Sequence, residues 1–386
     1  MTKRICFITG SRAEYGLLKP LMDEFKKDTE YSIQLIVTGM HLSPEFGLTY
    51  IEIENDGYFI NEKIEILLSS DSKIGVSKAM GLAMISFSEV YERLKPDLLF
   101  GLGDRFELFA AVSVANVANI PVAHLHGGEL TLGAFDEAFR HAITKMSHLH
   151  FTATEEYRER VIQLGENPKT VFNVGALGVD NIKKVKLLTK NEIEDILKIK
   201  LNKTTLLVTY HPETRSENSN NEFNELLKVF DELENLQLIF TLPNADCGGR
   251  KLIEIVKKFI DNNKNRAFAF TSLGQLKYLS LMKYVNGVIG NSSSGLIETP
   301  TFKIGTINIG DRQKGRISAK SVVNVKVIKK EIVKAINLIL SKEFKQKISK
   351  IKNSYGDGNT APRIKKIIDK TDFNKIIYKE FYDISR

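Results

Sequence analysis

Short apolar runs alternate with amphipathic stretches along the whole chain, and this alternation restricts the fold more than any other feature. Eleven runs have the length and composition of buried strands. Continuous apolar runs separated by helical patterns indicate parallel strands covered by helices on both faces. The sequence therefore predicts an α/β protein with doubly wound sheets. The expected strands are 5–9, 33–38, 98–101, 122–126, 149–152, 171–174, 205–209, 236–242, 268–271, 287–290 and 306–309.

The chain has 386 residues, which is more than one domain of this class usually contains. Regular strands give way to lysine-rich helical sequence between Gly175 and Leu201. We therefore predict two Rossmann-like domains, 1–175 and 176–363, facing across a cleft. The last segment, 364–386, has a helical pattern, and we expect it to cross back to the first domain.

The net charge of +8 is concentrated near the end of the chain, where residues 314–352 contain twelve Lys or Arg and two Glu. A nucleic-acid surface is one interpretation. However, apolar residues recur there at helical spacing, and no aromatic stacking platform accompanies them. We therefore expect a solvated lysine-rich helix face and no nucleic-acid partner. The apolar positions are Ile332, Ala335, Ile336, Ile339 and Leu340.

The sequence also indicates the cellular setting. No apolar run reaches the ~18 residues of a membrane span, and the first expected strand follows Arg4 directly, which leaves no room for a signal peptide. The two cysteines, Cys6 and Cys247, are far apart and form no zinc motif. We expect a reduced, cytoplasmic protein without a membrane partner.

Polar residues cluster directly after five of the expected strands. In doubly wound sheets, ligands bind beyond the carboxyl ends of the strands. Five clusters in two domains therefore predict one site in the cleft. They are Gly10-Ser11-Arg12, Gly103-Asp104-Arg105, His124–Glu129, Tyr210-His211-Pro212-Glu213 and Gly290–Glu298.

The last of these clusters predicts an anion site. Gly290–Glu298 contains Ser292, Ser293 and Gly295, and it joins an apolar run to an expected helix. Backbone N–H groups and the positive end of a helix dipole would meet there, which suits a diphosphate. Glu298 lies one turn further, where a carboxylate could bind two ribose hydroxyls. A plain capped helix is the alternative, because serine is also a common N-cap residue.

Three carboxylates are candidates for proton transfer. Asp104 ends a strand, with a helix cap bonded to Arg105 as the alternative. Glu129 follows two glycines, which turn chemistry alone would explain. Asp136 shares a helix face with Arg140, with a surface ion pair as the alternative. If the three carboxylates converge, mutual repulsion would raise one pKa toward neutrality.

Cationic and histidine side chains complete the candidates. Arg12 and Arg312 lie near glycines and suit phosphate oxygens. His211 ends a strand, where it could donate to a diphosphate or pack as a core histidine. His124 and His126 share one face of an expected strand. No third ligand stands at metal spacing from them, so we expect no metal site.

The motifs together resemble those of the hydrolysing UDP-N-acetylglucosamine 2-epimerases of bacterial sialic acid synthesis. The resemblance runs nearly end to end, and the set is highly specific. Its motifs are Gly10–Gly16, Val37–His41, Gly103–Arg105, His124–Glu129, Phe135–Glu137 with Arg140-His141, Ile143–Ser147, His211–Thr214, Gly290–Glu298 and Gly310–Arg316.

The resemblance implies a fold like the B-type glycosyltransferases, a homodimer or larger oligomer, and no cofactor. It implies that a UDP-2-acetamido sugar and water become UDP and the free 2-epimeric sugar, through a 2-acetamidoglycal. The residues implied to contact UDP are Arg12, His211, Ser292, Ser293, Glu298 and Arg312, whereas Asp104, Glu129 and Asp136 are implied to transfer protons.

The chain departs from the non-hydrolysing relatives at His126, where they carry a glutamate. Either Glu129 supplies the missing carboxylate or His126 is the acid–base group. The lysine that those relatives place five residues after the motif arginine is Leu17 here.

Other functions fit parts of the pattern. A glycosyltransferase of the same fold would share the UDP grip but would need an acceptor pocket. A nucleotide-sugar-binding regulator would need no carboxylate cluster. Within the family, the same motifs serve enzymes acting on UDP-N-acetylglucosamine, toward N-acetylneuraminate, and on UDP-N,N′-diacetylbacillosamine, toward legionaminate. We expect the first sugar and keep the second as the alternative.

Overall fold

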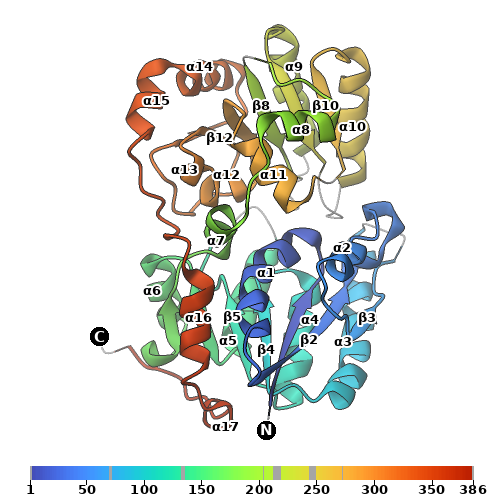
Figure 1. Cartoon of the computed structure of the whole chain (residues 1–386), viewed down its shortest axis with the longest axis vertical. Helices are drawn as coiled ribbons and strands as arrows, with labels where there is room; N and C mark the ends of the chain where they lie inside the picture. Colours follow the sequence, from blue (N-terminus) through green and yellow to red (C-terminus); the bar gives the residue numbers. More distant parts are fainter. Residues whose placement is uncertain are drawn as a thin grey trace. The chain divides into compact units, whose positions relative to one another are not determined.

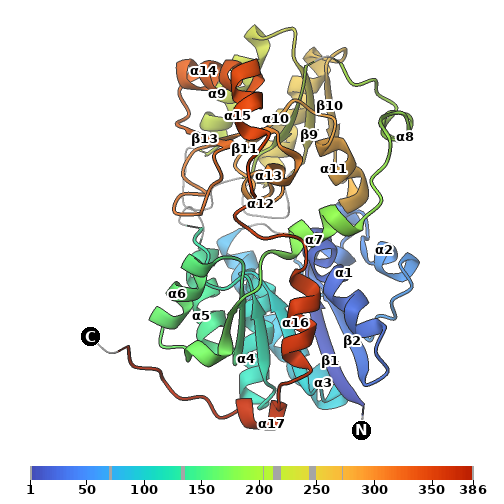
Figure 2. The ribbon, with the colours of Figure 1, turned by 60° about the vertical axis from the view of Figure 1, so that its left-hand side comes forward.

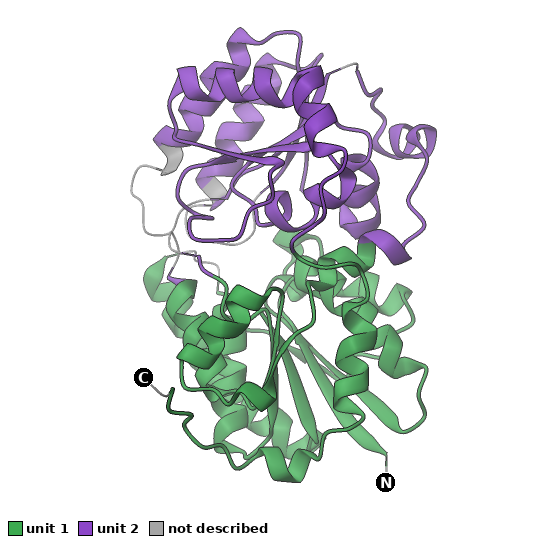
Figure 3. Ribbon diagram, turned by 90° about the vertical axis from the view of Figure 1, so that its left-hand side faces the viewer, with its two compact units in different colours: residues 1–129, 136–181, 355–386 green, residues 130–135, 182–354 purple. Residues whose placement is uncertain are grey.

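The computed structural model describes residues 2–68, 72–131, 135–202, 204–211, 219–242, 249–271 and 273–384. The chain forms two compact units (Figure 3). Unit 1 comprises residues 1–129, 136–181 and 355–386, and unit 2 comprises residues 130–135 and 182–354. The corresponding expectations were 1–175 with 364–386, and 176–363.

Unit 1 contains a seven-stranded parallel sheet with the order β3-β2-β1-β4-β5-β6-β7 (Figure 1). The strand order reverses between β1 and β4. The strands are β1 (Lys3–Thr9), β2 (Tyr31–Thr38), β3 (Glu62–Ile64), β4 (Leu98–Leu102), β5 (Val122–Leu125), β6 (Leu149–Thr152) and β7 (Val171–Asn173). The helices are α1 (Arg12–Lys26), α2 (Tyr50–Asn55), α3 (Lys73–Leu94), α4 (Phe106–Val117), α5 (Asp136–Met146), α6 (Glu155–Gln163), α16 (Thr360–Ile368) and α17 (Phe373–Ile376), and α7 (Leu177–Lys184) links the units.

Alternate residues of β1 fill two separate cores, one on each face of the sheet. Ile5 and Phe7 pack in the core formed with α1 and α16, whereas Cys6 and Ile8 pack in the core formed with α3 and α4. A strand buried on both faces needs apolar residues at every position, which is why these strands are continuous apolar runs.

Unit 2 contains a six-stranded parallel sheet with the order β10-β9-β8-β11-β12-β13. Its strands are β8 (Thr205–Thr209), β9 (Gln237–Thr241), β10 (Ala267–Phe270), β11 (Gly287–Gly290), β12 (Gly305–Ile309) and β13 (Val322–Val325). Its helices are α8 (Lys190–Leu197), α9 (Ser219–Glu232), α10 (Gly249–Asn262), α11 (Gly274–Met282), α12 (Ser294–Ile297), α13 (Thr299–Phe302), α14 (Lys329–Leu340) and α15 (Lys342–Ile348). The predicted α/β fold with parallel sheets is confirmed.

The lysine-rich end of unit 2 is a solvated helix face, as expected. In α14, the side chains of Ile332, Ala335, Ile336 and Ile339 are buried in the unit 2 core. Lys329, Lys330 and Lys334 of the same helix are exposed. An apolar stripe facing the core with lysines opposite is typical of a surface helix of a globular protein.

The predicted strands differ from the structure in two respects. The edge strands β3 and β13 were not expected, because they are three and four residues long and only partly buried. The predicted strand 122–126 ends at Leu125, because His126 has a left-handed backbone with φ of +64°. The chain therefore leaves the sheet one residue earlier, and His124 and His126 do not lie on one strand face.

The end of the chain packs on unit 1. Asp180 accepts hydrogen bonds from the backbone N–H groups of Thr360 and Ala361, at 2.9 and 2.8 Å, and so caps α16. This helix packs against α1, with Ile364 and Ile368 in the same core (Figure 2).

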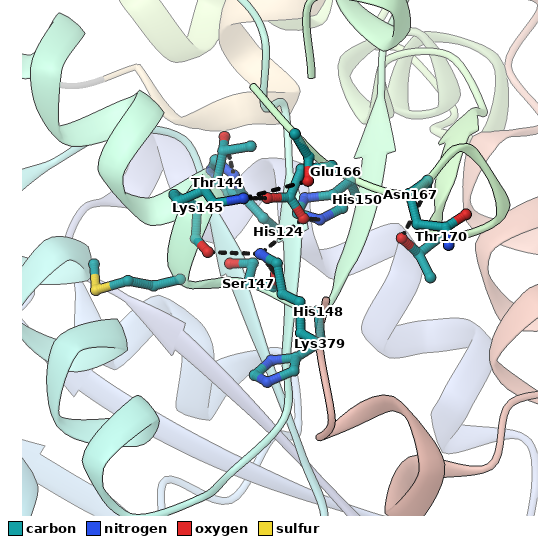
Figure 4. Close-up of polar contacts among 12 residues, drawn as sticks. His124, Thr144, Lys145, Ser147, His148, His150, Glu166, Asn167, Thr170 and Lys379 are labelled. Atoms are coloured by element: carbon teal, nitrogen blue, oxygen red, sulfur yellow. Dashed lines mark hydrogen bonds and ion pairs between the residues drawn. The ribbon is translucent and has the colours of Figure 1, made fainter. Parts of the chain in front are cut away.

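The residues after α17 are held by a buried charge cluster around Glu166 (Figure 4). The Glu166 carboxylate lies 2.7 Å from Lys379 Nζ, and 2.9 Å from both Lys145 Nζ and His150 Nε2. Burial alone would raise the pKa of Glu166, but these three bonds outweigh it and lower the pKa to about 2. No helix in the described ranges is long and apolar enough to cross a membrane.

Candidate active site

Beyond the carboxyl ends of β4 and β5, the buried side chain of Arg140 contacts two other predicted residues, Asp104 and His126. Gly103, with φ of +86°, turns the chain after β4 and is followed by Asp104. The Asp104 carboxylate pairs with the guanidinium of Arg140 on α5. Arg140 is 3% exposed, and its second nitrogen donates to the carbonyl of His126 at 2.8 Å. One buried arginine therefore joins the turns after two neighbouring strands.

Arg140 and Arg105 each bond to a carboxylate that the sequence did not suggest. The alternatives considered from the sequence were a surface ion pair of Asp136 with Arg140 and a helix cap of Asp104 bonded to Arg105. Arg140 is buried and pairs with Asp104, and Arg105 bonds to Glu107 at 3.2 Å. Asp136 opens α5 and is half-buried. It lies four residues before Arg140, and therefore on the same face of the helix.

His126 and Glu129 form a buried dyad. His126 Nδ1 lies 2.6 Å from Glu129 Oε1, and the two residues are 8% and 2% exposed. Because a carboxylate accepts hydrogen bonds, it favours the imidazole tautomer with the proton on Nδ1. His126 Nε2 is buried and has no hydrogen-bond partner among the described residues. In this tautomer Nε2 carries a lone pair. We call Asp104, His126, Glu129, Asp136 and Arg140 the carboxylate site.

A second pair of acidic residues, which the sequence analysis missed, lies where the strand order reverses. Glu14 accepts from the backbone N–H groups of Gly10 and Ser11 at 2.7 and 3.1 Å, and it lies 3.9 Å from Arg105 Nε. Burial and the nearby Glu107 raise the pKa of Glu14 to about 7, although Arg105 opposes this. The spacing of Ser11 and Glu14 is that of a capping box, which was the available signal.

Arg12, predicted to contact UDP, belongs to unit 1. It is the first residue of α1, and its Nε donates to Glu52 at 2.6 Å. Its side chain is 15% exposed.

The turn after β11 in unit 2 requires glycine at its first position. Gly290 has φ of +144°, and a Cβ there would lie 1.9 Å from the carbonyl oxygen of Thr209. The Ser292 hydroxyl accepts from the backbone N–H of Ser294 at 3.4 Å, whereas Ser293 makes no side-chain cap bond. Gly295 packs closely on Thr306, since a Cβ would lie 2.8 Å from its methyl group.

The helix expected after this turn is broken into two. Helix α12 has four residues, Glu298 follows it, and α13 continues with four more. Pro300 explains the break, because a proline ring clashes with the carbonyl four residues earlier in a continuous helix. The helix dipole at the turn is therefore weaker than expected.

Asn291 organises unit 2's candidate residues, and the sequence analysis did not single it out. Its side chain accepts from the backbone N–H of His211 at 2.7 Å and donates to the His211 carbonyl at 2.8 Å. Its own carbonyl accepts from Arg312 Nη1 at 3.1 Å and Gln313 Nε2 at 2.8 Å. Asn291, which follows β11, therefore contacts the turn after β8 through its side-chain amide and the turn after β12 through its backbone carbonyl. The expected residues Pro212 to Thr214 lie outside the described residues.

We call the unit 2 group the serine site. It contains His211, Asn291, Ser292, Ser293, Gly295, Glu298 and Arg312. Near it, the hydroxyl of Tyr278 lies 2.7 Å from that of Ser294. Among the described residues of both units, no cluster of three or more His, Cys, Asp or Glu could hold a metal ion.

Known proteins are similar to this chain over nearly its full length. A family model described as UDP-N-acetylglucosamine 2-epimerase matches residues 23–369. The GDP/UDP-N,N′-diacetylbacillosamine 2-epimerase (hydrolyzing) of Campylobacter jejuni is 46% identical over 387 residues, with 100% of both chains covered. Polysialic acid biosynthesis protein P7 of Escherichia coli is 42% identical, with 99% of this chain and 98% of that protein covered.

Solved structures share the fold. The UDP-GlcNAc 2-epimerase from Neisseria meningitidis, bound to UDP-GlcNAc, superposes with a TM-score of 0.82 at 21% identity and covers 95% of this chain and 100% of that chain. The structural likeness confirms the predicted two-domain architecture, and the sequence matches identify the family. The protein is an enzyme of the UDP-N-acetylglucosamine 2-epimerase family and belongs to its hydrolysing branch.

Proposed function

We propose that the two sites perform a hydrolytic 2-epimerisation of a UDP-2-acetamido sugar, with proton transfer assigned to the carboxylate site and UDP binding to the serine site. The buried His126–Glu129 dyad, beside the Asp104–Arg140 pair, carries this proposal. These titratable groups are bonded to one another beyond the carboxyl ends of strands, where doubly wound sheets bind ligands.

The reaction has two halves. In the first, a base removes the proton from C2, the electron pair of that bond forms a C1–C2 double bond, and UDP leaves C1 with the electrons of the C1–O bond. In the second, the oxygen of water bonds to C1 and gives up one proton to a base, while the electron pair of the double bond takes a proton at C2 on the opposite face. The sum is UDP-sugar plus water giving UDP and the free 2-epimer, with no change of oxidation state.

We assign His126 Nε2 as one proton carrier, with Glu129 holding the ring in the tautomer that leaves Nε2 basic. This joins the two alternatives that the sequence left open, because the carboxylate and the imidazole are in contact at 2.6 Å. Proton transfer on two faces of C2 needs a second group. Asp104 and Asp136 are the candidates, with Arg140 holding Asp104 in place.

The serine site suits the leaving group. Elimination from C1 requires stabilisation of negative charge on UDP, and preorganised donors typically contribute ~10²–10³ in rate each. Arg312 and His211 supply a cation and a polar donor, and Ser292 and Ser293 supply hydroxyls. Asn291 keeps Arg312 and His211 in register. Glu298 is assigned to the ribose hydroxyls, and Arg12 of unit 1 to a phosphate oxygen.

For the sugar, we propose UDP-N,N′-diacetylbacillosamine first and UDP-N-acetylglucosamine second, which reverses the order expected from the sequence alone. Identity of 46% over the full length to a relative named for the first sugar supports this order. Identity of 42% to a relative named for polysialic acid biosynthesis supports the second candidate. Homo-oligomerisation stays a prediction from the family resemblance.

The test is to incubate the protein alone with each UDP-sugar in deuterated water. Release of UDP and of a free sugar deuterated at C2 is expected without any acceptor. A requirement for an acceptor would favour a glycosyltransferase, and binding without release would favour a regulator. Comparison of kcat/KM for the two UDP-sugars, with the GDP-linked sugar as a third arm, decides the substrate. A preference of more than about tenfold for UDP-N-acetylglucosamine would reverse our order.

A further inference from the structure

His124 lies next to the carboxylate site but is not one of its proposed proton-transfer groups. It is fully buried near the end of β5. Its Nε2 lies 2.8 Å from the carbonyl oxygen of Gly103, and its Nδ1 lies 3.1 Å from the hydroxyl of Thr144. Figure 4 shows His124 and Thr144 side by side beside the Glu166 cluster.

These two contacts connect the elements that carry the carboxylate site. Gly103 directly precedes Asp104. Thr144 is on α5, and its hydroxyl lies 3.0 Å from the carbonyl of Arg140. The turn that carries the dyad rests on the same pair, because a Cβ on Gly127 would lie 3.0 Å from Thr144 Oγ1 and 3.1 Å from His124 Nδ1.

The hydrogen bonds define the state of the imidazole. A carbonyl can only accept, so Nε2 of His124 donates to Gly103 and carries the proton in the neutral ring. Nδ1 then presents its lone pair to the Thr144 hydroxyl, whose single proton is shared between this nitrogen and the Arg140 carbonyl. Burial lowers the pKa of His124 to about 3. The hydrogen bond to the Gly103 carbonyl opposes this shift, and the positive charge of Arg140 adds to it. The ring therefore stays neutral and in one tautomer near neutral pH.

We propose that His124 is a positioning residue for proton transfer: its neutral imidazole holds the Asp104 turn and α5 in register with the His126–Glu129 dyad. This rests on the proposed function of the carboxylate site. Misplacing a reacting group by about 1 Å can cost on the order of 10²-fold in rate. Loss of the Gly103 bond frees the residue before Asp104, and loss of the Thr144 contact frees the helix that carries Arg140.

The experiment compares His124→Leu, which removes both contacts, with His124→Gln, whose amide N–H can still reach the Gly103 carbonyl. His148→Leu is the matched control. His148 is also a buried histidine of unit 1, but its Nδ1 accepts from the backbone N–H of Val122 at the other end of the strands. Each variant is corrected for its folded fraction, and turnover is measured with the UDP-sugar and with its C2-deuterated form.

For His124→Leu we expect kcat to fall by on the order of 10²-fold, with KM and the Kd of UDP within about threefold of wild type. The deuterium isotope effect should rise, because proton transfer then limits the rate more fully. His124→Gln should recover about tenfold of the loss. His148→Leu should lower stability and leave kcat per folded molecule and the isotope effect unchanged.

A His124→Leu enzyme whose corrected kcat and isotope effect match those of His148→Leu would overturn the inference, since both histidines would then only support the fold. If His124→Leu does not fold, Thr144→Val against Thr144→Ser makes the same comparison through the partner hydroxyl. A wild-type protein that turns over no UDP-sugar would overturn the proposed function and the inference with it. Active wild type with a silent His124→Leu would overturn the inference alone.

Discussion

The carboxylate site and the serine site lie at equivalent places in two similar sheets, yet they are built from different kinds of bond. In unit 1, titratable side chains bond directly to one another: Glu129 to His126, and Asp104 to Arg140. In unit 2, the side chain and the backbone carbonyl of one neutral residue hold the site together. Asn291 bonds to the backbone of His211, and its own carbonyl accepts from Arg312.

The difference matches what each proposed task demands. A proton-transfer site needs groups whose charge changes during the reaction, and their distances must be fixed by partners that respond to that charge. A diphosphate site needs hydrogen-bond donors whose charge does not change. Neutral carbonyl and amide groups can hold such donors in place, and they do not neutralise the positive charge that attracts the anion. The same topology therefore supports two chemistries through the residues that follow its strands.

The largest expected effect comes from the dyad. His126→Asn should lower kcat by ~10²–10⁴-fold, the usual range for general acid–base catalysis. It should leave the Kd of UDP, measured by calorimetry, nearly unchanged, because none of the proposed UDP donors is part of the dyad. Glu129→Gln should also lose activity and should alter the pH profile of kcat. Supplying the 2-acetamidoglycal directly identifies which half-reaction each variant has lost. Wild-type turnover by both variants would show that the dyad does not transfer protons, and the carboxylate site would then not differ from the serine site in this respect.

Glu166 tests whether every buried ionic cluster of unit 1 serves the reaction. The pKa of Glu166 is lowered from its ordinary value to about 2, so its ionised form stabilises the folded state. The contribution is present above pH ~4.5, is lost as the pH falls toward ~2, and amounts to about 3 kcal/mol. Glu166→Gln should therefore reduce the free energy of unfolding of unit 1 at pH 7, and should reduce it by roughly half as much or less at pH 3.

The control for this change is Glu159→Gln, which neutralises an exposed carboxylate on α6 of the same unit. It should alter the free energy of unfolding by at most about 0.5 kcal/mol. Urea unfolding of both variants is compared at the two pH values. Glu166→Gln should keep the wild-type kcat in the folded fraction. A loss of kcat as large as that of the dyad variants would extend the catalytic role to the Glu166 cluster.

The next effect concerns the serine site. Arg312→Ala removes a charge-assisted donor, which is worth roughly 1.5–3 kcal/mol, so the Kd of UDP should rise by about 10–150-fold. Asn291→Leu should weaken UDP binding in the same direction, because it removes both side-chain bonds that hold the backbone of His211. Hydration of added 2-acetamidoglycal should be nearly unaffected in both, since no UDP leaves in that step. Unchanged UDP affinity would show that the diphosphate binds elsewhere.

Central strands were predictable and contact partners were not, for physical reasons. Residues 5–9 and 287–290 are buried on both faces, so their apolar runs were visible, whereas β3 is a short edge strand. The left-handed backbone of His126 has no sequence signal comparable to glycine. The Arg140–Asp104 pair spans 36 positions and the Asn291–His211 pair spans 80, and helical or strand periodicity carries no information about such distances.

The smallest effect sharpens the comparison through Glu298, a carboxylate of the serine site. If Glu298 only binds UDP and does not transfer protons, Glu298→Gln should raise the Kd of UDP by only ~2–10-fold. This is the effect of losing one hydrogen bond worth roughly 0.5–1.5 kcal/mol. The pH profile of kcat should stay the same, in contrast with Glu129→Gln. Both changes neutralise one carboxylate without altering its shape. A changed pH profile in Glu298→Gln would mean that residues of both units transfer protons. The assignment of proton transfer to the carboxylate site alone would then be wrong.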